Sequence, residues 1–286
     1  MELLATVAAA GEPARFHSGP GSFDMTLTDD VISMHGRDIR LLRGGDGHPL
    51  LFLHDPWTYC WLPIHDRLAA QYHVVLPIHP GFAESSGLDA LDRMEDLVFH
   101  YLDLLEVLGF EHPILMGASF GGWLATEFAI RYTGMLRALV LVDALGLRLP
   151  GASATDVFQL DVQQLRAALF EDATATLARE LVPDIPPRES IEAMLKARQV
   201  LARFAWQFPD NPRLASYLYR VKCPTLIVWG ERDGVVSVNH GHAYQRGILD
   251  AALAVLPGCG HLPHVEQSEA VGNIVLNYLE QRDARV

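Results

Sequence analysis

Ser119 lies in a sequence pattern that can turn a serine hydroxyl into a nucleophile. Residues Gly117–Gly121 match the pattern G-x-S-x-G and follow the apolar run His112–Met116. A helical pattern begins directly afterwards, at Gly122. A strand, this pattern and a helix in that order predict a tight turn that exposes the serine hydroxyl at the end of a sheet. The two glycines are expected because a side chain there would collide with the neighbouring strand and helix.

Two further residues could complete this chemistry. A serine hydroxyl is a weak nucleophile unless a base accepts its proton and a carboxylate orients that base. Asp233 follows the apolar run Leu226–Trp229, and His261 lies in a glycine-containing loop after the apolar run Ala252–Leu256. Catalytic groups in open parallel sheets gather at the carboxyl ends of strands, where both residues are expected. Ser119, Asp233 and His261 are therefore the predicted nucleophile, acid and base.

Asp143 is an alternative candidate for the acid, because it ends the apolar run Leu136–Val142. The alternative for Asp233 is a purely structural role in its Asp-Gly turn, since both residue types favour turns. We favour Asp233, because its turn follows a strand end and the chain order Ser, Asp, His matches a known arrangement of these three groups.

Alternating strands and helices are expected to position these residues. Continuous apolar runs predict strands buried on both faces of a sheet, and amphipathic stretches between them predict helices. This alternation predicts an α/β fold with a doubly wound, mostly parallel sheet. The predicted strands are 23–28, 39–42, 49–54, 72–76, 112–116, 136–143, 223–230 and 252–256, and the predicted helices are 60–70, 92–109, 122–130, 239–248 and 265–282.

The alternation of predicted strands and helices is interrupted between residues 147 and 215. This stretch contains helical patterns separated by prolines and no convincing strand. We interpret it as a helical lid inserted into a core formed by residues 23–146 and 216–286. Residues 1–22 are rich in glycine, proline and alanine, and we expect a flexible lead-in there. The helical patterns of the insertion cover residues 157–170, 173–182 and 189–207.

Five segments together resemble the α/β-hydrolase superfamily, in particular its lidded, esterase-like serine hydrolases. The resemblance extends from about residue 23 to residue 282. It implies the α/β-hydrolase fold, a nucleophile role for Ser119, a general base and acid role for His261 and an orienting role for Asp233. It also implies that the backbone N–H of Phe120 forms part of an oxyanion hole. The segments are Leu51–His54, Pro80–Phe82, Gly117–Gly122, Val228–Asp233 and Gly258–His261.

The loop after the predicted strand 49–54 departs from the family pattern. Relatives commonly read His-Gly-x, and the x residue supplies the second oxyanion donor. Here His54 is followed by Asp55 and by Pro56, which has no N–H. We predict that the Trp57 N–H replaces it; otherwise a side chain such as Tyr59 or His54 substitutes, or one donor is missing. Loss of one donor costs about 3 kcal/mol of transition-state stabilisation. The Asp55 carboxylate would repel an oxyanion unless it points away or pairs with a neighbour.

Aromatic and polar residues near these segments predict the substrate pocket. Aromatic walls favour a small, fairly apolar substrate. The predicted pocket residues are His54, Asp55, Tyr59, His79 and Trp123.

Charge and composition exclude several other classes of function. The formal net charge of the 286-residue chain is −13, which argues against nucleic acids and anionic membranes as partners. No apolar run approaches the ~18 residues of a membrane span. The N-terminus carries Glu2 and no early basic residue, which is a poor secretory signal, so we expect a cytoplasmic protein. A homo-oligomer is compatible with the sequence.

No cofactor or metal is expected. The three cysteines lack C-x-x-C spacing, and we expect them to be reduced. The pairs His240/His242 and His261/His264 come without the ligand set of a zinc enzyme. A serine, histidine and aspartate relay needs no cofactor.

Three functions remain open at this point. The favoured one is a serine hydrolase that cleaves an ester or related acyl bond of a small, fairly apolar substrate through an acyl-enzyme on Ser119. The second is a carbon–carbon bond hydrolase of the ring-cleavage-product type, which would use the same three residues. The third is a weakly active, ligand-binding homologue, suggested by the unusual Asp55 and Pro56.

Overall fold

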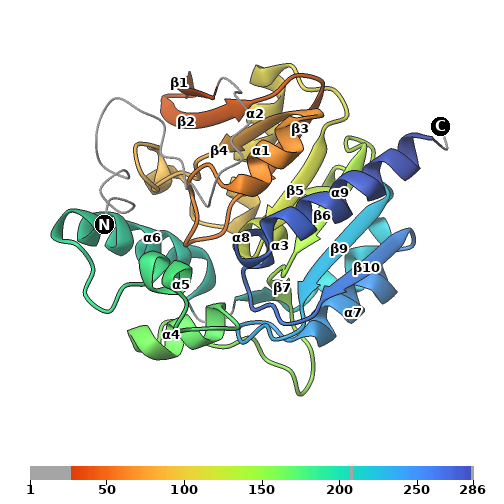
Figure 1. Cartoon of the computed structure of the whole chain (residues 1–286). Coiled ribbons are helices and arrows are strands. Elements are labelled where there is room, and N and C mark those ends of the chain that lie inside the picture. Colours follow the sequence, from red (N-terminus) through yellow and green to blue (C-terminus); the bar gives the residue numbers. More distant parts are fainter. Residues whose placement is uncertain (1–26, 207–208, 285–286) are drawn as a thin grey trace.

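The computed structural model of this chain describes residues 27–206 and 209–284. A mostly parallel sheet forms the centre, with α1 and α9 together on one face and α2 and α3 on the other (Figure 1). The α/β-hydrolase fold predicted from the sequence is confirmed. The predicted lead-in, 1–22, and most of the predicted strand 23–28 lie outside the described residues.

The sheet has eight strands in the order β1-β2-β4-β3-β5-β6-β9-β10. β1 pairs with β2, and β2 with β4, in antiparallel fashion, and all other neighbours are parallel. The strands are β1 (Thr28–Met34), β2 (Arg37–Gly44), β3 (His48–Leu53), β4 (Tyr72–Pro77), β5 (Ile114–Ala118), β6 (Ala138–Val142), β9 (Thr225–Gly230) and β10 (Ala251–Leu256).

Helices connect the parallel strands. β5, β6 and β9 are fully buried, as their continuous apolar runs predict, because helices cover both faces of a parallel sheet. The helices outside the insertion are α1 (Pro63–Ala69), α2 (Met94–Leu108), α3 (Phe120–Arg131), α7 (Val238–Gly247), α8 (Pro263–Glu266) and α9 (Ser268–Asp283). The single helix predicted at 265–282 is thus two helices, α8 and α9.

The first edge of the sheet differs from the sequence analysis. The structure has β1 at Thr28–Met34, a stretch that was not predicted as a strand. Its first four side chains are exposed, so it lacks the apolar alternation that a half-buried strand shows. Only its pairing with β2 along Thr28–Met34 makes it a strand.

The insertion between β6 and β9 is mainly helical, as predicted. It contains α4 (Val162–Leu169), α5 (Thr176–Leu181) and α6 (Ile191–Ala205). The expectation of no strand was wrong in one detail: β7 (Gly146–Leu147) and β8 (Asp210–Asn211) pair in parallel where the insertion leaves and rejoins the core. Two-residue strands are too short to leave a periodic pattern. The role of the insertion as a lid stays a prediction.

None of the helices within the described residues has the length and apolar character needed to span a membrane.

Candidate active site

Ser119 occupies the turn between β5 and α3 in a strained conformation. Its φ is 50° and its ψ is −114°, in a region that residues other than glycine rarely adopt. The predicted need for glycines is explained by distances. A Cβ on Gly117 would lie 2.3 Å from the Gly121 oxygen, and a Cβ on Gly121 would lie 2.1 Å from the Leu53 oxygen. Any side chain at either position would therefore displace the turn that holds the serine.

The three residues predicted to act together lie within hydrogen-bonding distance of one another. His261 Nε2 is 2.8 Å from Ser119 Oγ, and His261 Nδ1 is 2.9 Å from Asp233 Oδ2. The other oxygen of Asp233 accepts the N–H groups of Val235 and Val236, both at 2.8 Å. With Nδ1–H donated to the carboxylate, Nε2 is left to accept the serine proton. The arrangement can therefore activate Ser119 as a nucleophile.

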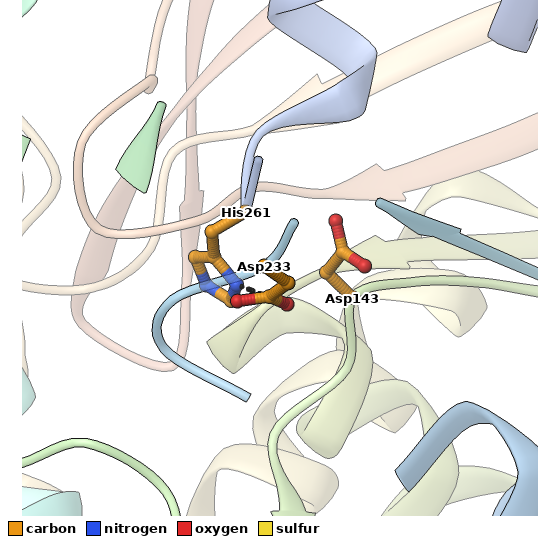
Figure 2. A group of neighbouring side chains, drawn as sticks. All are labelled: Asp143, Asp233 and His261. Carbon is orange, nitrogen blue, oxygen red and sulfur yellow. Dashed lines mark hydrogen bonds and ion pairs between the residues drawn. The ribbon is translucent and has the colours of Figure 1, made fainter. Parts of the chain in front are cut away.

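Asp143 lies beside this relay but is not bonded to the histidine. Its Oδ1 accepts the Gly230 N–H at 2.9 Å. Figure 2 shows Asp143 and Asp233 reaching the site from different loops, with the hydrogen bond of His261 made to Asp233. Burial, together with the charge of Asp233, raises the pKa of Asp143 well above its usual value. The geometry therefore favours Asp233 as the orienting acid.

Asp143, Asp233 and His261 form a group of potential metal ligands within the described residues, and their ligand atoms lie within 4.8 Å of one another. Both ring nitrogens of His261 are already engaged, by Ser119 and Asp233. The group therefore offers no free imidazole to a metal ion.

The backbone N–H of Phe120 is the first of α3, where N–H groups have no acceptor inside the helix. Its role as an oxyanion donor, which the resemblance implies, stays a prediction. The Trp57 N–H is not free for an oxyanion, because it donates to Asp55 Oδ1 at 2.7 Å, so the prediction for this group was wrong. Trp57 instead approaches the site with its indole ring, whose centre is 5.8 Å from that of His261.

Asp55 is buried and fully paired, which answers the question its sequence position raised. Its carboxylate accepts the Trp57 and Thr58 N–H groups, the Thr58 hydroxyl, and His264 Nε2 at 2.9 Å. Burial alone would raise the pKa of Asp55, but the hydrogen bonds and charge of His264 and the bonds from Thr58 and Trp57 hold it below its usual value. Asp55 thereby joins the loop after β3 to α8, the helix that follows the loop carrying His261.

His54 and His79 belong to a buried network with Tyr101 rather than to an open pocket. His54 Nδ1 is 2.6 Å from the Asp55 carbonyl oxygen, and its Nε2 accepts the His79 N–H at 3.0 Å. His79 Nε2 donates to the His54 carbonyl, and its Nδ1 is hydrogen-bonded to the Tyr101 hydroxyl. Burial lowers the pKa of His54 to about 4. Neither ring has a nitrogen free to bind a substrate or an oxyanion, so His54 does not substitute as an oxyanion donor, and a place for the two residues in the pocket wall stays a prediction.

The other two predicted pocket residues have different surroundings. The Tyr59 ring packs against His54 and Phe82, with ring centres 6.0 and 5.4 Å away. The indole N–H of Trp123 donates to the buried Glu127 at 3.0 Å. Tyr59 stays a pocket prediction, whereas Trp123 directs its only polar group into the protein.

Sequence reasoning missed the part that the insertion plays in holding the site. The carbonyl of Leu169, at the end of α4, accepts the His261 N–H at 2.8 Å. The preceding carbonyl, of Ala168, accepts the N–H of Gly234, the residue after Asp233. The insertion thus supports both the acid loop and the histidine loop. Backbone carbonyls make these contacts, and because every residue type has one, no sequence pattern predicts them.

The curated relatives that this chain resembles are named as hydrolases. The 2-hydroxy-6-oxo-6-phenylhexa-2,4-dienoate hydrolase of Burkholderia cepacia is 26% identical over 269 residues, covering 84% of this chain and 91% of that protein. The 2-hydroxy-6-oxononadienedioate/2-hydroxy-6-oxononatrienedioate hydrolase of Comamonas testosteroni is 28% identical over 266 residues, with the same coverage of 84% and 91%.

Solved structures show the same fold. A bacterial membrane phospholipase A superposes with a TM-score of 0.78 at 23% identity, covering 90% of this chain and 87% of that one. The 2-hydroxy-6-oxo-6-phenylhexa-2,4-dienoate hydrolase of Rhodococcus sp. strain RHA1 superposes with a TM-score of 0.73 at 18% identity, covering 90% and 99%. The sequence model of the alpha/beta hydrolase family matches residues 50–273. Because that match spans most of the sequence, the chain belongs to the alpha/beta hydrolase family.

Proposed function

We propose that this protein is a serine hydrolase that cleaves a carbon–carbon bond in a 2-hydroxy-6-oxo-dienoate, the type of compound that forms when an aromatic ring is opened. The observation that carries the hydrolase assignment is the buried relay of Ser119, His261 and Asp233, with hydrogen-bond distances of 2.8 and 2.9 Å. The names of the relatives support this substrate class over simple esters. The carbon–carbon alternative of the sequence analysis is thus preferred to its leading interpretation.

The relay can perform each step of this reaction. Ser119 Oγ adds to the ketone carbon while its proton moves to His261 Nε2, and the Phe120 N–H faces the resulting oxyanion. This step requires the 2-keto tautomer of the substrate, in which the proton of the 2-hydroxyl has moved to the carbon next to the ketone. Collapse breaks the bond between that carbon and the former ketone carbon, the electron pair delocalises into the conjugated 2-keto group of the leaving fragment, and this fragment takes up the proton held by His261 Nε2. The acyl group stays on Ser119. Water then attacks it, with His261 as base, and releases a carboxylic acid.

One observation keeps ester hydrolysis as a second candidate. The residues that flank the nucleophile and the base in sequence, Ala118, Phe120 and Leu262, are apolar and buried. None of these three neighbours has a side-chain donor that could bind the carboxylate of a dienoate. An ester without a charged group requires no such donor.

Kinetics with the two substrate classes test the proposal. The first substrate is 2-hydroxy-6-oxo-6-phenylhexa-2,4-dienoate, followed by loss of its conjugated absorbance, and the second is p-nitrophenyl butyrate. We expect a higher kcat/KM for the dienoate. Turnover of the ester alone would refute the carbon–carbon assignment and support the second candidate.

Replacement of the nucleophile tests the mechanism itself. Ser119→Ala is expected to lower kcat by at least about a thousandfold and to abolish labelling by a fluorophosphonate probe. Ser216→Ala removes an exposed hydroxyl and serves as the matched control. Full turnover by the Ser119 variant would contradict the acyl-enzyme. Absence of both turnover and labelling in the unaltered protein would favour the ligand-binding homologue.

A further inference from the structure

Asp143 is a buried carboxyl group that the proposed mechanism does not use. It directly follows β6, has a φ of 42°, and is fully buried. Its Oδ1 accepts the Gly230 N–H at 2.9 Å, whereas its buried Oδ2 has no hydrogen-bond partner within the described part of the chain. A buried oxygen without a partner is unfavourable, so the state of this group needs a physical explanation.

The surroundings of Asp143 are acidic. Asp233 reaches it from the loop after β9, Glu266 from α8 and the Cys259 thiol from the histidine loop. Atoms of Asp143, Asp233 and His261 lie within 4.8 Å of one another. Two carboxylates buried side by side cannot both be ionised and instead retain a proton between them. Burial and the charge of Asp233 raise the pKa of Asp143, which places the proton there.

Asp233 has more hydrogen-bond donors around it than Asp143. Its Oδ1 accepts two backbone N–H groups and its Oδ2 accepts from His261, and donors of this kind stabilise a negative charge. Asp143 has a single backbone donor, the Gly230 N–H. The negative charge therefore stays on Asp233 and the proton on Asp143.

We propose that Asp143 is a positioning residue that carries a proton on Oδ2 and directs this O–H at the carboxylate of Asp233. This hydrogen bond holds the Asp233 side chain against its loop. It also keeps the combined charge of the Asp143 and Asp233 carboxyl groups beside His261 at −1. The inference rests on the proposed function, because Asp143 acts through the relay.

Two replacements of similar size separate positioning from packing. Asp143→Asn keeps an acceptor for the Gly230 N–H and offers an N–H to Asp233 in place of the O–H. Asp143→Leu fills the volume but has neither group. The rate of labelling by a fluorophosphonate reports on the relay without any assumption about the natural substrate.

We expect Asp143→Asn to label at a rate within about threefold of the unaltered protein, and Asp143→Leu to label on the order of ten to a hundred times more slowly. Both proteins are compared at equal folded fraction, measured by thermal unfolding. Above neutral pH the labelling rate of the asparagine variant should stay level even where that of the unaltered protein falls, because asparagine has no proton to lose. Equal rates for the two variants would overturn the proposal.

Infrared spectroscopy tests the protonated carboxyl directly in the unaltered protein. At pH 8 ordinary aspartates have lost their protons, so we expect the carbonyl stretch of a carboxylic acid to persist there and to be lost in Asp143→Asn. A missing band overturns the proposal even when the relay labels normally. A persisting band without labelling of Ser119 would refute the proposed function and leave the Asp143 assignment intact.

Discussion

The hydrogen bond between Asp55 and His264 should be one of the strongest stabilising contacts between the loop after β3 and α8. Oδ2 of Asp55 and Nε2 of His264 are 2.9 Å apart, and both side chains are fully buried. We consider three variants: Asp55→Asn, His264→Phe, and the double variant that carries both replacements. Asparagine keeps an acceptor for the Trp57 and Thr58 N–H groups but presents an N–H to His264, so two donors face each other.

The magnitude follows from burial. Removing one partner of a buried, charged pair costs about 3–5 kcal/mol, because the other partner stays buried without compensation. Each single variant should therefore lose about 3 kcal/mol of unfolding free energy. The double variant is left with one unpaired group, the asparagine N–H that faces phenylalanine, just as each single variant is left with one, and it should therefore lose about as much as either single variant. The coupling between the two positions is then about 2–3 kcal/mol.

Urea unfolding at pH 7 measures these free energies, and the fluorophosphonate labelling rate measures the effect on the site. Asp250→Asn is the matched control, because Asp250 bonds Arg282 across two elements with its side chain 48% exposed, against 0% for Asp55. An exposed pair of this kind contributes about 0–1 kcal/mol. Labelling should slow in Asp55→Asn and stay unchanged in the control.

Additive effects would refute this reasoning. If the double variant lost the sum of the two single losses to within about 0.5 kcal/mol, the residues would not be coupled. A loss in Asp55→Asn no larger than that of Asp250→Asn would mean that burial does not strengthen the contact. Either result would remove the physical account of an aspartate at this loop position.

Three further outcomes are expected. Burial, with a contribution from a nearby arginine, lowers the pKa of His100 to about 3, so the folded state resists its protonation and loses stability as the pH falls below the unfolded pKa of 6.5. His100→Leu should therefore remove a loss of about 2 kcal/mol of unfolding free energy between pH 8 and pH 5 in urea unfolding, whereas a change at the exposed His242 should not; an unaltered pH dependence in His100→Leu would contradict the assignment. Gly121→Ala should abolish fluorophosphonate labelling of Ser119, because the new Cβ would lie 2.1 Å from the Leu53 carbonyl oxygen in β3. Gly134→Ala, whose Cβ would have no atom within 4 Å, should label normally, and equal labelling of the two variants would show that the turn tolerates a side chain. Glu127→Ala should lower the unfolding free energy by about 3 kcal/mol, because this buried carboxylate accepts hydrogen bonds from Trp123 on α3 and Asn211 on β8. A loss under about 1 kcal/mol would show that water replaces the carboxylate.

Most elements of the core could be predicted because their signals are local. Strands β5, β6 and β9 are continuous apolar runs, and α2 ends at Gly109, whose φ of 66° favours glycine. β1 could not be predicted, since its exposed side chains carry no pattern and only pairing with β2 defines it. The same limit applies to the two-residue strands of the insertion.

A polar role for His54 or His79 could not be judged from the sequence for a related reason. His54 and His79 have residue types that suit a substrate site, but their ring nitrogens are used by one another's backbone, by Asp55 and by Tyr101. Residue type alone does not reveal where a hydrogen bond is directed. The Trp57 N–H was assigned to the oxyanion hole by position in the loop, and the Asp55 side chain takes it.

The sequence by itself predicted which three residues meet at the site, Ser119, Asp233 and His261, because each lies in a short motif after a strand and the three follow one another in a known order. Tertiary structure decided which other groups stand against them. Asp55 and His264 are 209 positions apart, and Asp143 and Gly230 are 87 apart. No local pattern can encode contacts over such separations, since they arise only when the folded sheet brings its strand ends to one edge.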